Sequence, residues 1–109
     1  MQMKVAIEEY EDIVWEAYPI VDLTINSLAL CAEAGEFGNK VKKDLLFRTL
    51  KDPRYVKSAP PGEMLEELGD VLWHIAQCAR LLGSDLQGVI NISTMKTVKR
   101  NEKYFQQGE

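Results

Sequence analysis

The sequence contains few cysteines and no long hydrophobic run. Its two cysteines, Cys31 and Cys78, stand in apolar stretches without a C-x-x-C spacing. This argues against a disulfide framework or a zinc ribbon and favours small buried residues in a reducing compartment. No apolar run approaches the roughly 18 residues of a membrane-spanning helix, and no basic-then-apolar leader opens the chain. We therefore expect a cytoplasmic protein with no membrane partner.

Basic residues are also in deficit. Asp and Glu number 17 against 13 Lys and Arg, which gives a formal net charge of -4 at pH 7. A nucleic-acid-binding protein needs a basic surface, so long nucleic acid is not expected as a partner. The chain has 109 residues, of which 46% are hydrophobic and 28% charged, and we expect residues 1–109 to form one globular domain.

Strand signals are poor, whereas four helical segments can be drawn. The first ends before Pro19, because proline disfavours helix in the residue before it. The second is expected over about residues 22–46, and it is apolar nearly all round from Leu28 to Ala34, so this part is expected to be buried. The apolar stripe of the first helix comprises Met3, Ile7, Tyr10, Val14 and Ala17.

The one long connection runs over residues 47–62 and is rich in proline and bases. Because proline is tolerated in the first turn of a helix, Pro61 or the glycine after it is expected to begin the third helix, which Gly83 ends. Ser84-Asp85-Leu86-Gln87 fits a capping box for a fourth helix, whose apolar face fades after Lys96. The expected fold is all-α, a bundle of four helices.

Two pairs of acidic residues stand three apart on the expected helices. Glu33 and Glu36 lie on the second helix, and Glu67 and Asp70 lie on the third, so each pair projects to one side of its helix. Like charges so placed cost only ~0.2–0.5 kcal/mol on an exposed helix, so the third-helix pair also fits an ordinary solvent-facing side. That polar side comprises Glu63, Glu66, Glu67, Asp70, His74 and Gln77.

Glu33 is harder to explain as a solvated residue, because its neighbours are apolar. An ionised carboxylate in such surroundings needs a cation or a metal. If the second and third helices pack antiparallel, the four carboxylates can converge, and an all-oxygen cluster suits a hard cation such as Mg²⁺. Small residues that would let another helix or a ligand approach Glu33 are Ala32, Ala34, Gly35 and Gly38.

The acidic pairs stand in the segments Leu28-Ala-Leu-Cys-Ala-Glu-Ala-Gly-Glu-Phe and Glu66-Glu-Leu-Gly-Asp-Val-Leu-Trp. These segments resemble the E-x-x-E and E-x-x-D motifs of the MazG-type nucleoside triphosphate pyrophosphohydrolases, and the similarity extends to about Asn91. The resemblance implies the all-α MazG fold, completed by dimerisation in a homodimer or homotetramer. It also implies Mg²⁺-dependent hydrolysis, with Mn²⁺ as a substitute, of a nucleoside triphosphate to the monophosphate and pyrophosphate. The implied metal ligands and catalytic residues are Glu33, Glu36, Glu67 and Asp70.

Further residues are candidate contacts of the nucleotide. Asn26 lies two turns before Glu33 on the same helix face, where it can touch base or sugar. Lys40 can reach phosphate or form an ion pair with Glu36, and Trp73 can stack on the base or belong to the core. The basic connection can receive the triphosphate or be a solvated loop. The candidates are Asn26, Lys40, Lys43, Arg54, Trp73, Asn91 and Lys96.

Two alternatives compete with the enzyme. Thr94 and Val98 stand where members of the family carry Lys and Arg, which keeps open a non-catalytic helical module that senses nucleotide or binds a protein. A di-iron bundle needs E-x-x-H, and it is disfavoured because Val71 stands three residues before His74. His74, four residues after Asp70, can hydrogen-bond that carboxylate, bind metal or do neither.

Overall fold

A computed structural model describes residues 3–52, 54 and 61–107 of the chain. It contains four helices: α1 (Ile7–Ala17), α2 (Leu23–Arg48), α3 (Pro61–Leu81) and α4 (Leu86–Gln107). Within these residues there is no strand, and the expected all-α fold is confirmed. Pro53 and Pro60 of the connection lie outside the described residues. None of the described helices is long and apolar enough to cross a membrane.

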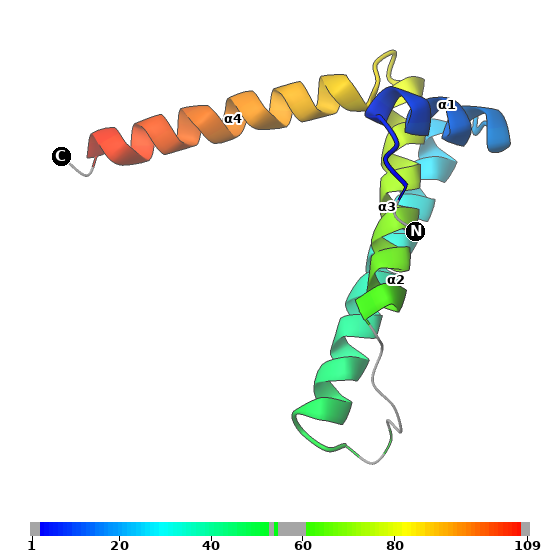
Figure 1. Cartoon of the computed structure of the whole chain (residues 1–109), viewed down its shortest axis with the longest axis vertical. Helices are drawn as coiled ribbons and strands as arrows, with labels where there is room; N and C mark the ends of the chain where they lie inside the picture. Colours follow the sequence, from blue (N-terminus) through cyan, green and yellow to red (C-terminus); the bar gives the residue numbers. More distant parts are fainter. Residues whose placement is uncertain (1–2, 53, 55–60, 108–109) are drawn as a thin grey trace.

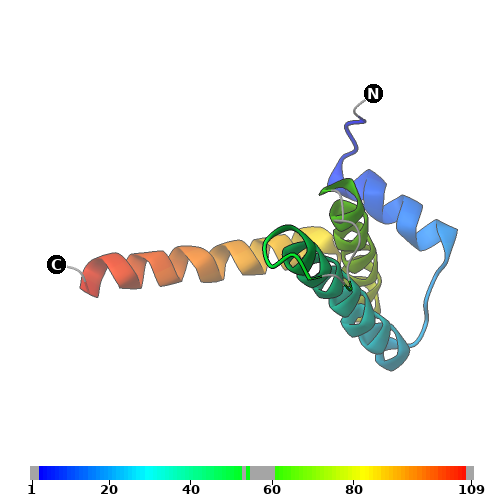
Figure 2. The same ribbon diagram turned by 90° about the horizontal axis from the view of Figure 1, so that it is seen from below.

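The helices form an open arrangement within one chain (Figures 1 and 2). α2 and α3 run side by side as an antiparallel hairpin, and α1 crosses the hairpin near the C-terminal end of α3. α4 begins at that same end and projects away from the hairpin, so that in the described part of the chain it contacts α1 and α3 but not α2. A single chain therefore does not close its four helices into a bundle.

Local signals place the helix ends close to where the sequence predicts them. Asp22 caps α2, its carboxylate accepting the N–H of Ile25 at 3.0 Å. Gly83 ends α3 with a φ of 78°, a left-handed conformation that glycine adopts without strain. Two boundaries differ from the prediction: α1 begins at Ile7 rather than near Met3, and α4 continues well past Lys96.

The core is small and lies where α1, α3 and the start of α4 meet. Val14, Ala76 and Leu86 are buried there, and the partly buried residues packed against them are Tyr10, Trp15, Trp73 and Ile75. The expected burial from Leu28 to Ala34 is wrong for the single chain, because Leu28 is 68% exposed and Cys31 is exposed. The reason is that α3 covers one side of α2 and no other described helix contacts it.

The polar side of α3 is not uniformly solvated, which corrects the expectation for Gln77. Gln77 is fully buried because α1 and the segment after it close over it. Its Nε2 donates to the carbonyl oxygen of Tyr18 at 2.9 Å and to that of Val14 at 3.4 Å, and its Oε1 accepts the N–H of Ile20 at 3.4 Å. These bonds tie α1 to α3 and satisfy an amide that would otherwise be costly to bury.

Trp15 makes a second link between α1 and α3. Its indole N–H donates to the carbonyl oxygen of Ala76 at 3.1 Å, and the guanidinium of Arg80 lies 5.0 Å from its ring centroid. The ring therefore combines a hydrogen bond with a cation–π contact.

The N-terminus of α4 is capped by two carboxylates. The buried Glu11 of α1 accepts the N–H of Leu86 at 2.6 Å, and Asp85 accepts the N–H of Gly88 at 2.8 Å. Asp85, rather than Ser84 of the predicted capping box, is thus the local cap. Because the first N–H groups of a helix lack partners within it, Glu11 both satisfies one of them and fixes α4 to α1.

We expect Glu11→Ala to lower the free energy of unfolding by about 1–3 kcal/mol, because a buried charge-assisted cap is lost. Urea unfolding followed by circular dichroism measures the change. Glu16→Ala, an exposed acid on the same helix, is the control and should change stability by no more than about 0.5 kcal/mol. Equal effects of the two substitutions would contradict the capping role.

Candidate metal site

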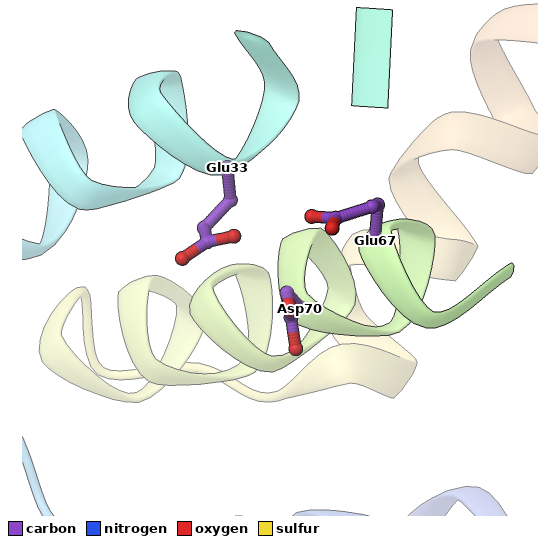
Figure 3. A group of neighbouring side chains, drawn as sticks. All are labelled: Glu33, Glu67 and Asp70. Carbon is purple, nitrogen blue, oxygen red and sulfur yellow. The ribbon is translucent and has the colours of Figure 1, made fainter. Parts of the chain in front are cut away.

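Three carboxylates from α2 and α3 lie close together (Figure 3). Glu33 comes from α2, and Glu67 and Asp70 come from α3, one turn apart on the same side. One carboxylate oxygen of each residue lies within 4.8 Å of those of the other two. Glu33 and Glu67 are partly buried and Asp70 is exposed. The antiparallel hairpin thus brings together residues that are 34 or more positions apart in the sequence.

Among the described residues, no base forms an ion pair with the cluster. The ion pairs of the described residues join Lys40 to Glu63, Arg48 to Asp44 and Arg54 to Asp52, and none includes a member of the cluster. Carboxylates this close repel one another, and a bound cation would relieve the repulsion. Oxygen donors alone are the ligands that Mg²⁺ and other hard cations prefer.

Glu36 lies outside this cluster. It is exposed and stands one turn further along α2 than Glu33, so the structure brings together three of the four predicted carboxylates. Its role as a metal ligand stays a prediction.

Tyr10 is a neighbour of the cluster that the sequence reasoning missed. It lies on α1 and is partly buried. Burial raises the pKa of its hydroxyl above the usual value of 10.0, and the negative charge of Asp70 raises it further. The sequence placed Tyr10 on an apolar stripe, and no local signal indicates that this stripe reaches the acidic side of α3.

Asn26 does not contact the site as predicted. It is 0% exposed, and its side chain bonds to α3 instead of reaching a ligand. Of the alternatives for His74, a bond to Asp70 is absent from the described hydrogen bonds, and the Nδ1 of His74 lies 2.6 Å from the Oδ1 of Asn26. Asn26 and His74 thus face each other across the contact of α2 with α3.

Two of the candidate bases pair with acids outside the cluster. Lys40 pairs with Glu63 at 3.4 Å rather than with Glu36, and Lys43 is exposed on α2. Arg54 binds Asp52, and its hydrogen bonds to that carboxylate lower the pKa of Asp52 to about 2. Among the described ion pairs, Lys40 and Arg54 thus have partners other than the three carboxylates.

The remaining candidate substrate contacts lie beside the core or on α4. Trp73 packs against the core and meets His74 edge-on, with ring centroids 4.9 Å apart. Asn91 accepts a hydrogen bond from Gln87 at 2.9 Å, and both Asn91 and Lys96 are exposed on α4, which does not contact α2 in the described chain. Within one chain they do not converge with the three carboxylates.

No other part of the described chain packs closely against the glycines near Glu33. A Cβ atom added at Gly35 or Gly38 would have no neighbour within 4 Å. The expected close approach of another helix is therefore absent at these two positions.

Fold and site together define an all-α protein with an acidic cluster shared by two antiparallel helices. The family model of the MazG nucleotide pyrophosphohydrolase domain matches residues 23–105, and the chain belongs to this family. A curated relative, the "Gene 37 protein" of Mycobacterium phage L5, is 36% identical over 90 residues, which cover 82% of this chain and 75% of the relative. No solved structure matches the chain.

We expect Asp70→Asn to lower the pKa of Tyr10, because the nearby negative charge is removed, but to leave it above 10.0, because burial remains. An ultraviolet titration of the phenolate, with Tyr10→Phe subtracted, measures it. The raised pKa favours the neutral phenol in the folded chain. Neutral Tyr10 therefore contributes to the stability of the folded chain below pH 10. This contribution is lost as the pH rises through the pKa that Tyr10 has in the folded chain. Glu66→Gln, an exposed neighbour, should leave the titration unchanged, and a Tyr10 pKa unaffected by Asp70→Asn would contradict the proximity.

Proposed function

We propose that this member of the MazG family hydrolyses nucleoside triphosphates to the monophosphate and pyrophosphate with Mg²⁺ bound at Glu33, Glu67 and Asp70. The observation that carries the proposal is the convergence of these carboxylates, from both acidic motifs, on one point between two helices. Family membership supports the reaction class, and the oxygen-only donor set supports a hard divalent cation, with Mn²⁺ as a substitute.

The chain's own residues fit this chemistry in distinct ways. Phosphoryl transfer depends mainly on positioning and charge neutralisation, and Mg²⁺ supplies both an electrophile for phosphate oxygens and a more acidic water when bound. Glu33, Glu67 and Asp70 hold the cation. Glu36 is exposed one turn away, where its carboxylate is available to bind a further ion or to accept the proton of the attacking water.

Substrate contacts are proposed for a smaller set than the sequence suggested. Lys40 forms a partly exposed and therefore weak ion pair with Glu63. It can leave Glu63 and bind a phosphate of the substrate instead. Lys43 and Arg54 supply positive charge from the hairpin end. Lys96 supplies positive charge, and Asn91 a neutral hydrogen-bonding amide, only if α4 meets the hairpin of a second copy of the chain. Asn26 is not proposed as a substrate contact because it is fully buried. Base stacking by Trp73 is not proposed because this partly buried ring packs against the core.

We expect Glu67→Gln to lower the rate of pyrophosphate release by on the order of 100-fold or more, because one ligand of the cation is lost. The test is a panel of ribo- and deoxynucleoside triphosphates with Mg²⁺ or Mn²⁺. Glu66→Gln, the neighbouring acid outside the cluster, is the matched control and should retain activity.

Two results would contradict the proposed enzymatic activity or its cation site. Background turnover of the whole panel by the unmodified chain would exclude it, and binding of nucleotide without turnover would support the non-catalytic module. A melting temperature that Mg²⁺ does not raise would contradict the cation site, because a ligand that binds the folded state stabilises it.

We also propose that the chain functions as a homo-oligomer. The projecting α4 exposes apolar side chains along its length, and an isolated helix is only marginally stable in water. The hairpin exposes apolar side chains as well, so a second copy of the chain can cover both surfaces. The exposed residues are Val89, Ile92, Met95 and Val98 on α4, and Leu28, Leu65, Leu68 and Leu72 on the hairpin.

We expect the chain to elute as a dimer or tetramer in size-exclusion chromatography with light scattering. Ile92→Glu should weaken the association by about tenfold or more, because Ile92 is 64% exposed in the single chain and would be covered in the oligomer. Ser93→Glu adds the same charge next to it on α4 and is the control. A monomeric unmodified chain at micromolar concentration would contradict the proposal.

A further inference from the structure

Asn26 is a fully buried polar residue on α2, a helix whose other side chains are partly or fully exposed. It is 0% exposed and is the only buried residue of α2. Its Nδ2 donates to the carbonyl oxygen of His74 at 2.9 Å and lies 3.0 Å from the Sγ of Cys78. Its Oδ1 lies 2.6 Å from the Nδ1 of His74. One amide from α2 thus makes three contacts with α3.

These contacts determine the orientation of both side chains. The Nδ2 group faces two acceptors, so the Oδ1 atom must be the one that faces the imidazole ring. Oδ1 can only accept, so the Nδ1 of His74 carries a proton and donates it. The amide and the ring therefore fit each other at one relative position of α2 and α3.

The contact between Asn26 and His74 lies the same number of residues from the acidic cluster on both helices. Glu33 stands seven residues after Asn26 on α2, and Glu67 stands seven residues before His74 on α3. Seven residues are about two turns, so each pair lies on one face of its helix, about 10 Å further along. Because the helices are antiparallel, the position that places Asn26 against His74 also places Glu33 against Glu67.

We propose that Asn26 is a positioning residue that sets the register of α2 against α3 and thereby assembles the acidic cluster; the proposal rests on the function proposed above. Apolar contacts between two helices tolerate sliding, whereas a buried amide finds its partners at one register. Sliding by one turn, about 5.4 Å, would leave the amide unpaired at a cost of about 1–3 kcal/mol and would separate Glu33 from Glu67. Single buried polar residues act as register devices in other helix pairs.

The first experiment measures the register without any metal. Glu33→Cys and Glu67→Cys are introduced together in a Cys31→Ser, Cys78→Ser background, in which the serine hydroxyl at position 78 still offers an acceptor to Asn26. A short bis-methanethiosulfonate reagent then cross-links the two helices, and gel mobility separates links within a chain from links between chains. With Asn26 present the intrachain link should form at least about ten times faster than with Asn26→Leu.

The second experiment measures Mn²⁺ binding by electron paramagnetic resonance on chains with their native cysteines and carboxylates. Asn26→Leu should weaken Mn²⁺ binding by about tenfold or more. Val14→Ala is the control, since it destabilises the core between α1, α3 and α4 without touching the contact of α2 with α3. Val14→Ala should leave both the Mn²⁺ affinity and the cross-linking rate unchanged. If Asn26 only contributed to overall stability, the two substitutions would have similar effects on both measurements.

The outcomes separate this proposal from the proposed function. Cross-linking that is as fast with Asn26→Leu as with Asn26 overturns the register role, whatever the metal does. Failure of the unmodified chain to bind Mn²⁺, with cross-linking still dependent on Asn26, overturns the cation site and leaves the register role standing. If Asn26→Leu does not fold, His74→Phe removes the ring donor but keeps the carbonyl partner. An unchanged cross-linking rate in His74→Phe likewise overturns the proposal.

Discussion

The contact of α2 with α3 controls the geometry of the acidic cluster. In the described chain α2 touches no other helix, so every group that it carries is placed through α3 alone. The buried amide of Asn26 supplies directional bonds in this contact, where the surrounding side chains are mostly small or exposed. Directional bonds matter here because apolar packing by itself permits helices to slide, whereas a buried amide needs its partners in place.

α3 in turn is the element that holds the remaining helices. Its C-terminal half binds α1 through Gln77 and through the carbonyl that accepts from Trp15, and it shares the small core with the start of α4. Glu11 completes this end by capping α4. Glu67 and Asp70 of the acidic cluster stand in the N-terminal half of α3, and Glu33 stands on α2, which contacts no other described helix.

Sequence patterns predicted the helices well because local chemistry determines their ends. Pro61 and Gly83 act as the first-turn proline and the terminating glycine that the sequence predicted, and Asp22 caps the helix that was expected to begin near residue 22. The same patterns misjudged burial at Leu28, because periodicity gives the direction of a side chain but not whether another element covers it. They misjudged Gln77 and Asn26 for the converse reason, since a polar residue on a helix face can meet a partner instead of water.

Sequence patterns alone were enough to predict the four helices and the two acidic motifs, and the resemblance of those motifs indicated the MazG family, which the family match shows. These depend on neighbours within a few residues and on motif spacing, which a chain carries before it folds. The packing of α2 on α3 brings Glu33, Glu67 and Asp70 together and leaves Glu36 outside the cluster. It also buries Asn26 between the two helices. Those outcomes depend on the rotation and register of one helix against another, which long-range contacts select and no local pattern contains.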